Sequence, residues 1–305
     1  MLTHRLTRIS LRRFCAKVNP PQPPAEQAIE FLQEVVGGAR GIPRAGLFQA
    51  LIGNHMTKFY LRTACPGFFD SVDEDVPKGA RAGLELIAAS PTSDEFMTVL
   101  NQCAEKKFFD EFKKSVSTVT GEKFVWKLDR IKGARLDTLH SIIGAQRGDS
   151  MKGKQFLSLM GQHFIVSPEF AEAIKIADIR QRASKCLPFL FADGALVRAR
   201  VLLTVDQTVT MPSLNEAGEL VDGKPIPQKD VEHIVTLEIS LTPRIGKKQM
   251  MASETILELT EDPLSAGSWR VVDVNFSVSD NYPLDPAGLV DETPERKDED
   301  ENKKP

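Results

Sequence analysis

Alternating apolar and polar residues between positions 195 and 278 predict the central feature of this chain, a β-sheet. Every second residue is apolar in residues 197–205, and the pattern recurs in residues 231–241. Two further runs, residues 249–260 and 269–278, follow them. A period of two is typical of a strand with one buried face. The chain therefore contains about four strands in this region.

Turn-forming residues, rather than helical segments, separate the four runs. They lie at residues 215–218, 222–223, 243–246 and 266–267. Strands that follow one another through short turns form hairpins, whereas parallel neighbours need a long crossover connection. The sheet is therefore expected to be antiparallel.

Apolar residues at helical spacing occur N-terminal to the sheet, so helices are expected to cover one of its faces. They lie in residues 25–36, 46–63, 77–89, 93–115 and 150–164. Ser93 and Ser167 are typical helix caps. Residues 172–183 fit a helix or an additional strand equally well. We expect an α+β fold in which N-terminal helices pack on a twisted, cone-like antiparallel sheet of about four strands.

The composition divides the 305 residues into four parts, and a hydrophobic content of 41% is sufficient for a core. Residues 1–24 form a basic segment with a Pro-rich spacer, and residues 25–119 form a helical region. Residues 120–285 form the cone-like α+β domain. Residues 286–305 form an acidic tail, in which residues 291–305 hold seven acids, four bases and no hydrophobic residue. That composition predicts a disordered terminus.

The N-terminal segment is typical of a mitochondrial transit peptide. Residues 1–17 contain five bases and no acid, and Leu2, Leu6 and Ile9 lie together on a helical wheel. The alternative is an ordinary basic N-terminus. We expect import into the mitochondrial matrix and cleavage between Phe14 and Pro20. No apolar run approaches the roughly 20 residues that a membrane-spanning helix needs.

The distribution of charge indicates one candidate binding surface. The net charge is −3, and removing the five positive charges of residues 1–17 leaves −8. Residues 105–154 reverse this balance, with twelve bases and seven acids. The candidate basic patch consists of Lys123, Lys127, Arg130, Lys132 and Arg135.

Aromatic and aliphatic residues are interleaved with this patch, which predicts a strand, or a hairpin that turns at Lys132-Gly133. Basic side chains beside exposed aromatic residues suit anionic lipid head groups or RNA phosphates. The alternative is a solvated edge with Trp126 in the core. The residue pattern leaves lipid and RNA open as partners.

Motifs for familiar enzyme classes are absent from the sequence, which has no phosphate-binding glycine loop, no zinc-protease motif and no nucleophile elbow. The four cysteines, Cys15, Cys65, Cys103 and Cys186, form no C-x-x-C pair. We therefore expect no metal site, no cofactor and no disulfide framework.

Acid–base chemistry in the sheet has only two candidates, Asp273 and His233. An isomerase-like cone would pair such a residue with a tyrosine in its cavity. The two tyrosines, Tyr60 and Tyr282, lie outside the predicted strands. We therefore expect a protein that is not an enzyme, and we keep a small-molecule-binding or isomerase-like cone as an alternative.

Several short motifs resemble a known family. They are V-R-A-R-V-L-L-T-V-D-Q-T-V from Val197, G-E-L-V-D-G from Gly218, P-Q-K-D-V-E-H-I-V from Pro227 and G-S-W-R from Gly267. Together they resemble the nuclear-transport-factor-two-like domain of a mitochondrial set of proteins. That set comprises the import-motor scaffold, the yeast-type ribosome receptor of the inner membrane, and the large mitoribosomal subunit protein that faces the inner membrane. The spacing resembles the third most, over roughly residues 120–280.

The resemblance implies a non-enzymatic function at the matrix face of the mitochondrial inner membrane. The first expectation is a ribosomal protein of the large mitochondrial subunit, a ribonucleoprotein, that helps dock translation to that membrane. Its implied partners are rRNA or ribosomal proteins, together with anionic lipids or an insertase, and no small-molecule substrate. The alternative is a peripheral scaffold for the import motor or for assembly of a respiratory complex.

Overall fold

The computed structural model describes residues 24–39, 49–66, 72–119, 124–150, 152–159, 162–186, 188–246 and 263–278, with residues 281 and 284. It has an α+β fold, as the sequence predicts. The sheet has seven strands in the order β2-β3-β1-β4-β7-β8, with β9 also paired to β7. All its pairings are antiparallel except that of β1 with β3.

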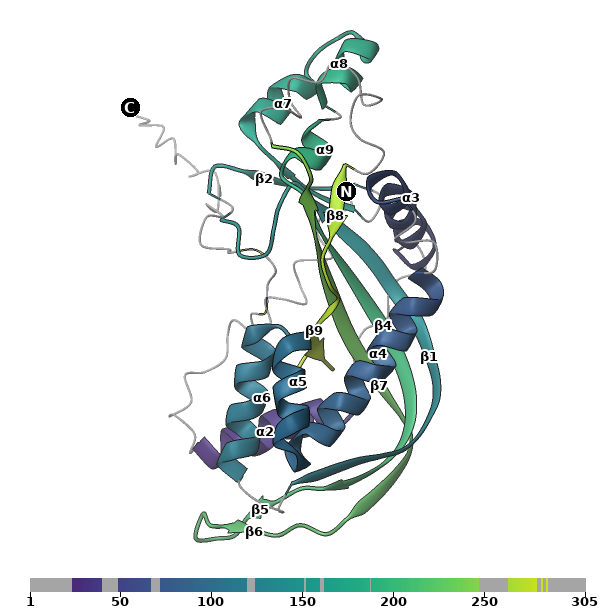
Figure 1. The fold of residues 1–305 in the computed structure, drawn as a ribbon. Coiled ribbons are helices and arrows are strands. Elements are labelled where there is room, and N and C mark those ends of the chain that lie inside the picture. Colours follow the sequence, from purple (N-terminus) through teal and green to yellow (C-terminus); the bar gives the residue numbers. More distant parts are fainter. Residues whose placement is uncertain are drawn as a thin grey trace, which may run out of the picture.

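Three long strands form the centre of the sheet: β1 (Val125–Ile143), β4 (Ala195–Thr210) and β7 (Ile226–Pro243). Figure 1 shows them as long ribbons that curve together, with helices on the concave side. The short strands are β2 (Gln155–Leu159), β3 (Gln162–Val166), β8 (Leu264–Ala266) and β9 (Arg270–Val274). The hairpin β5 (Ser213–Leu214) and β6 (Leu220–Val221) turns where the sequence predicts a turn.

The sheet is larger than the expected four strands because the chain before residue 195 adds three strands, β1, β2 and β3. Residues 150–164, predicted as a helix, contain β2 and β3, and β3 pairs in parallel with the end of β1 at Ile142 and Ile143. Pairing with β1, which is distant in sequence, outweighs the helical spacing of apolar residues in this segment. The alternative hairpin at Lys132-Gly133 is also wrong, because β1 runs through this point with a β-bulge.

The helices before the sheet follow the sequence more closely. They are α2 (Pro24–Val36), the π-helix η1 (Gln49–Gly53), α3 (Asn54–Ala64), α4 (Val72–Ala89), the 3-10 helix η2 (Ser90–Thr92), α5 (Asp94–Cys103) and α6 (Lys106–Val119). The α2 prediction is confirmed to within one residue. Helix α4 begins five residues before Pro77, and its first turn holds three acids, which the helix dipole favours there.

The helix predicted over residues 93–115 is two helices. Ser93 caps α5 by accepting a hydrogen bond from the backbone N–H of Phe96, as predicted. The break follows at Ala104, which forms a bridge with Val271 of β9, while the Glu105 N–H donates to the Val271 carbonyl at 2.7 Å. The chain leaves the helix here because its backbone pairs with the sheet.

Between β3 and β4 the structure decides the ambiguous segment in favour of helices. These are α7 (Pro168–Ile174), α8 (Ile179–Cys186) and α9 (Phe189–Ala192), and Ser167 caps α7 as predicted. The strand predicted over residues 249–260, the transit peptide and the acidic tail all lie outside the described residues.

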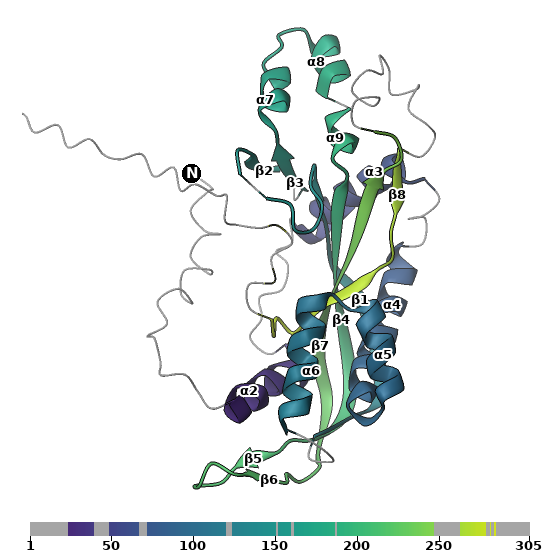
Figure 2. The ribbon, with the colours of Figure 1, turned by 60° about the vertical axis from the view of Figure 1, so that its left-hand side comes forward.

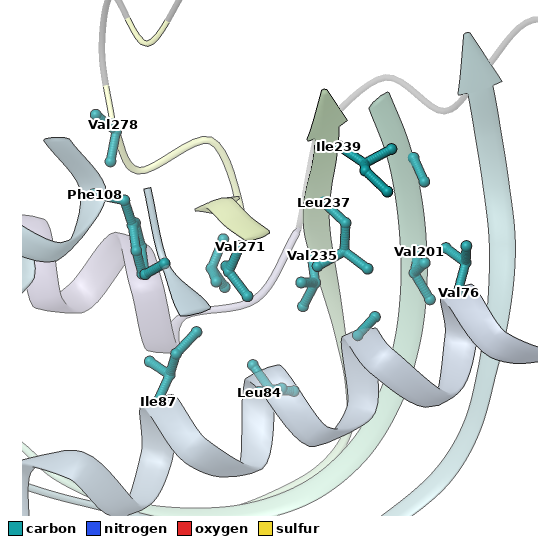
Figure 3. Packing of buried hydrophobic residues seen from close by; sticks show 14 of the residues in the cluster. Val76, Leu84, Ile87, Phe108, Val201, Val235, Leu237, Ile239, Val271 and Val278 are labelled. Atoms are coloured by element: carbon teal, nitrogen blue, oxygen red, sulfur yellow. The ribbon is translucent and has the colours of Figure 1, made fainter. Parts of the chain in front are cut away.

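The helices and the sheet share one apolar core. Figure 3 shows Val76, Leu84 and Ile87 of α4 facing sheet residues that include Val201 and Val235. All five side chains are at most 1% exposed. Burial of such side chains contributes about 1.5–3 kcal/mol each, so α4 holds the sheet's concave face in place.

Candidate functional site

Three of the predicted basic residues lie on the sheet face opposite the helices. Lys127, Arg130 and Arg135 are exposed, and their cross-strand partners in β4 occupy its outer face. Lys132 is exposed beside them at a β-bulge. Lys123 lies outside the described residues. Trp126 has the opposite orientation and is buried, with 3% of its surface exposed.

Neighbouring carboxylates neutralise part of this basic patch. The Lys132 ammonium lies 2.7 Å from both Asp206 and Asp230, and these contacts raise the pKa of Lys132. The Lys127 ammonium lies 3.1 Å from the carboxylate of Asp129.

Two cations of the patch keep their charge available. Among the described residues, no ion pair is found for Arg130 or Arg135. These two guanidinium groups are therefore the part of the patch best suited to bind an anionic partner.

A cleft of about 530 Å³ lies beside the patch, between α4 and the start of β1. Lys127 and Arg130 line one side of it, and Arg81 and Glu85 of α4 line the other. Arg81 and Glu85 form an exposed ion pair at 3.1 Å. The apolar residues of its lining include Ala88, Trp126 and Ile131. The lining of the cleft thus combines apolar and charged residues.

The edge of β1 that faces this cleft has no strand partner over residues 125–136, within the part of the chain that the structure describes. Helix α3 covers the next stretch, where the Asn54 side chain accepts a hydrogen bond from the Leu139 N–H at 2.7 Å. Bulges and charged side chains are common protections against unwanted pairing at an open edge. An open edge also offers backbone donors and acceptors to an extended peptide.

His233 belongs to a buried hydrogen-bond network rather than to an open pocket. Its Nδ1 accepts from the Asn275 side-chain amide at 2.9 Å, and its Nε2 donates to the Gln207 carbonyl oxygen at 2.9 Å. Trp126 donates to the same Gln207 oxygen at 2.9 Å, and Gln207 donates to the Val36 carbonyl at 2.8 Å. Burial lowers the pKa of His233 to about 4. The network joins the end of α2 to the sheet.

Asp273 and His233 lie on opposite faces of the sheet. Asp273 pairs with Thr236, which is three residues from His233 along an unbroken part of β7. Burial raises the pKa of Asp273 to about 6, and its carboxylate accepts hydrogen bonds from Ser277 and Val278. The two candidate acid–base residues therefore cannot act as a pair.

The tyrosines add no partner for them within the described residues. The Tyr60 hydroxyl donates to the Leu190 carbonyl at 3.1 Å, and burial raises its pKa far above the usual range. Tyr282 lies outside the described part of the chain.

The outer face of the sheet also carries a partly buried ion cluster. Glu238 is 5% exposed and accepts from Arg147 at 2.7 Å and from Arg198 at 2.8 Å. Arg200 lies next to Arg198 on this face and contacts the ring of Phe276. The charges of Arg147 and Arg198 are engaged by Glu238, and Arg200 lies 3.6 Å from Asp137, so this cluster is poorly suited to bind an anionic ligand.

Metal sites and membrane-spanning helices are both absent from the described residues. They contain no group of three or more His, Cys, Asp or Glu side chains placed to hold a metal. None of the described helices is long and apolar enough to cross a bilayer.

Sequence reasoning missed the partners that reshape the basic patch. Asp206 and Asp230 lie 74 and 98 residues from Lys132 in the chain. Arg81, across the cleft, lies in α4, 44 residues before the start of β1. No local pattern connects these residues, because only the tertiary fold brings them together.

The amino-acid sequence matches no protein-family model and no curated protein.

Proposed function

We propose that this chain is a non-enzymatic component of the mitochondrial large ribosomal subunit that helps dock translation to the matrix face of the inner membrane. The domain would be a cone-like member of the nuclear-transport-factor-two-like group. The proposal joins the transit-like N-terminus and the family resemblance to one structural observation. That observation is the exposed basic strand, where Arg130 and Arg135 have no ion-pair partner among the described residues.

The geometry of β1 supports contact with a large anionic partner. Lys127, Arg130 and Arg135 lie opposite outer-face residues of β4, so they are exposed on one face of the curved strand. Arginine binds phosphate with two parallel hydrogen bonds, and such contacts release counterions from RNA. This surface would therefore bind rRNA, and its attachment would weaken as salt increases.

Co-sedimentation with mitochondrial large ribosomal subunits tests this proposal. We expect the Arg130→Gln/Arg135→Gln variant to bind more weakly and to reduce the slope of log K against log salt by about two. The matched control is Lys106→Gln/Lys114→Gln, which removes the same charge from exposed positions of α6. The control should sediment like the wild type.

Two results would contradict the proposal. One is a wild-type protein that stays in light fractions at low and moderate salt. The other is equal sedimentation of the Arg130→Gln/Arg135→Gln variant and the wild type, with thermal melting unchanged in both.

The open edge of β1 favours a second candidate, a scaffold for the import motor or for assembly of a respiratory complex. The cleft has apolar residues in its lining, and the edge beside it has no strand partner among the described residues, which suits an extended segment of another protein. Native purification from matrix and inner-membrane fractions separates the two candidates. Translocase subunits in place of ribosomal proteins would favour the scaffold.

A further inference from the structure

Helices α7 and α8 are only partly packed against the rest of the described chain, for example through Phe170, whose ring centre lies 5.3 Å from that of Phe189. No residue of α7 is buried, and no described side chain of α8 is buried. The two helices have seven and eight residues. Isolated helices shorter than about 12–15 residues are marginal in water, and helices in proteins are stabilised mainly by burying an apolar face. This pair therefore has less buried apolar surface to stabilise it than the helices of the core.

Exposed apolar side chains gather on the same part of the chain. Ile179 is 76% exposed and Ile174 is 40% exposed, both on the helix pair. On the neighbouring edge strand β2, Phe156 and Leu157 are 47% and 44% exposed. We call the described residues between positions 152 and 186, which form β2, β3, α7 and α8, the projecting end. Phe156 and Leu157 follow each other in the strand and point to opposite faces, so the projecting end exposes apolar groups on both sides of β2, as interaction sites commonly do.

The projecting end is also basic, in a chain whose net charge is negative. It holds six bases and three acids. The bases are Lys152, Lys154, Lys175, Arg180, Arg182 and Lys185. One acid is already engaged, because Glu172 binds Lys175 at 2.6 Å. Arg180 and Lys185 are exposed beside Ile179 on α8.

The location of this end separates it from the basic patch of β1. Figures 1 and 2 both place α7 and α8 at one tip of the molecule, and the β5–β6 hairpin at the other. The first residues of β1 lie toward the hairpin, while Ile142 and Ile143 at its other end pair with the projecting end. A strand of 19 residues is at most roughly 60 Å long.

We propose that the projecting end docks on an anionic lipid surface. A peripheral membrane contact buries apolar side chains at the level of the head groups and binds those groups with Lys and Arg. RNA would satisfy the cations but would leave Ile179 and Leu157 in water. An acidic protein surface would do the same unless it were also apolar. A bilayer with anionic lipid provides both features at once.

This inference rests on the proposed function, because it identifies which part of a ribosome-docking protein meets the inner membrane. The β1 patch would bind the ribosome, and the projecting end would bind the lipid. The two attachments use different residues, so they can fail independently.

Flotation with vesicles tests the lipid contact. The probes are phosphatidylcholine vesicles with and without cardiolipin, at low and physiological salt. The full chain should float with the cardiolipin vesicles and not with phosphatidylcholine alone. Removing one well-placed charge weakens such binding about fivefold, so Arg180→Gln/Lys185→Gln should bind about 25-fold more weakly. Ile179→Ser/Leu157→Ser should also lose binding at both salt concentrations.

Matched controls make the test specific. Lys106→Gln/Lys114→Gln removes the same charge from α6, and Phe96→Ser removes an exposed apolar side chain from α5, where Phe96 is 44% exposed. Both should float like the wild type. The Arg130→Gln/Arg135→Gln variant should also float normally, and the projecting-end variants should still sediment with ribosomal subunits.

A wild-type chain that fails to float with cardiolipin vesicles would overturn the lipid contact. Equal flotation of the projecting-end variants and the two controls would also overturn it. Loss of ribosome sedimentation by Arg180→Gln/Lys185→Gln, with flotation intact, would assign this end to RNA instead. Because flotation uses purified protein, an absence of ribosome binding would refute only the proposed function.

Discussion

At the scale of single residues, buried polar groups give this fold its pH dependence. His233 is fully buried and neutral, with its pKa lowered to about 4, whereas a histidine in the unfolded chain has a pKa of about 6.5. As the pH falls from about 6.5 to about 4, the unfolded chain binds a proton that the folded protein excludes. Protonation of this site therefore favours unfolding in that pH window.

The resulting prediction concerns the free energy of unfolding of wild type and His233→Leu. The wild type should lose roughly 2–3 kcal/mol more than the variant between about pH 7.5 and about pH 4.5. Asp273 has the opposite effect on stability. Its pKa is about 6 in the folded protein, so as the pH falls the folded protein binds this proton before the unfolded chain does. Asp273 contributes equally in the wild type and in His233→Leu, so the difference between their free energies of unfolding reports on His233 alone. Urea titrations at each pH measure it, and parallel pH profiles would refute the assignment.

At the scale of elements, Glu105 lies at the break between α5 and α6 and forms hydrogen bonds with both β9 and α6. The Glu105 N–H donates to β9, and its carboxylate accepts from the backbone N–H of Lys107 at 2.9 Å and of Phe108 at 3.3 Å. The side chain thus occupies the N-cap of α6 and satisfies donors that the helix leaves free.

We predict that Glu105→Ala lowers the free energy of unfolding by about 1 kcal/mol, the usual cost of a lost N-cap. Glu105→Asp should retain most of the stability, because aspartate is a preferred N-cap residue. Chemical denaturation of the three proteins measures the effect. If Glu105→Asp is as unstable as Glu105→Ala, the cap is not the cause, and the contact of Glu105 with Arg147 at 3.8 Å would be the alternative.

At the scale of the whole molecule, two separated surfaces suit a bridging function. The basic patch of β1 and the projecting end are held apart by one long sheet (Figure 1). Distant sites with no shared partners usually contribute additively. Each surface should therefore bind its own partner without the other.

This arrangement predicts the behaviour of a three-component mixture of protein, ribosomal subunits and cardiolipin vesicles. Ribosomal subunits should float only when the wild-type protein connects them to the vesicles. Arg130→Gln/Arg135→Gln and Arg180→Gln/Lys185→Gln should each reduce this co-flotation, and the losses should multiply in the quadruple variant. If the losses do not multiply, the two double substitutions affect binding to the same partner.

The sequence alone determined the elements whose signals are local. The alternation in β4 and β7, the apolar spacing of α2 and the caps at Ser93 and Ser167 each depend on neighbours within a few residues. Such patterns reflect which side chains one element can bury, so they survive in the fold.

The tertiary structure decided what depends on distant partners. Residues 150–164 became strands because β3 pairs with β1, and the chain broke at Ala104 because its backbone pairs with β9. The charge of the basic patch was likewise reduced by Asp206 and Asp230, which approach Lys132 only in the folded sheet. Backbone pairing and ion pairing join residues that are distant in sequence, so the spacing of residues along the chain does not predict them.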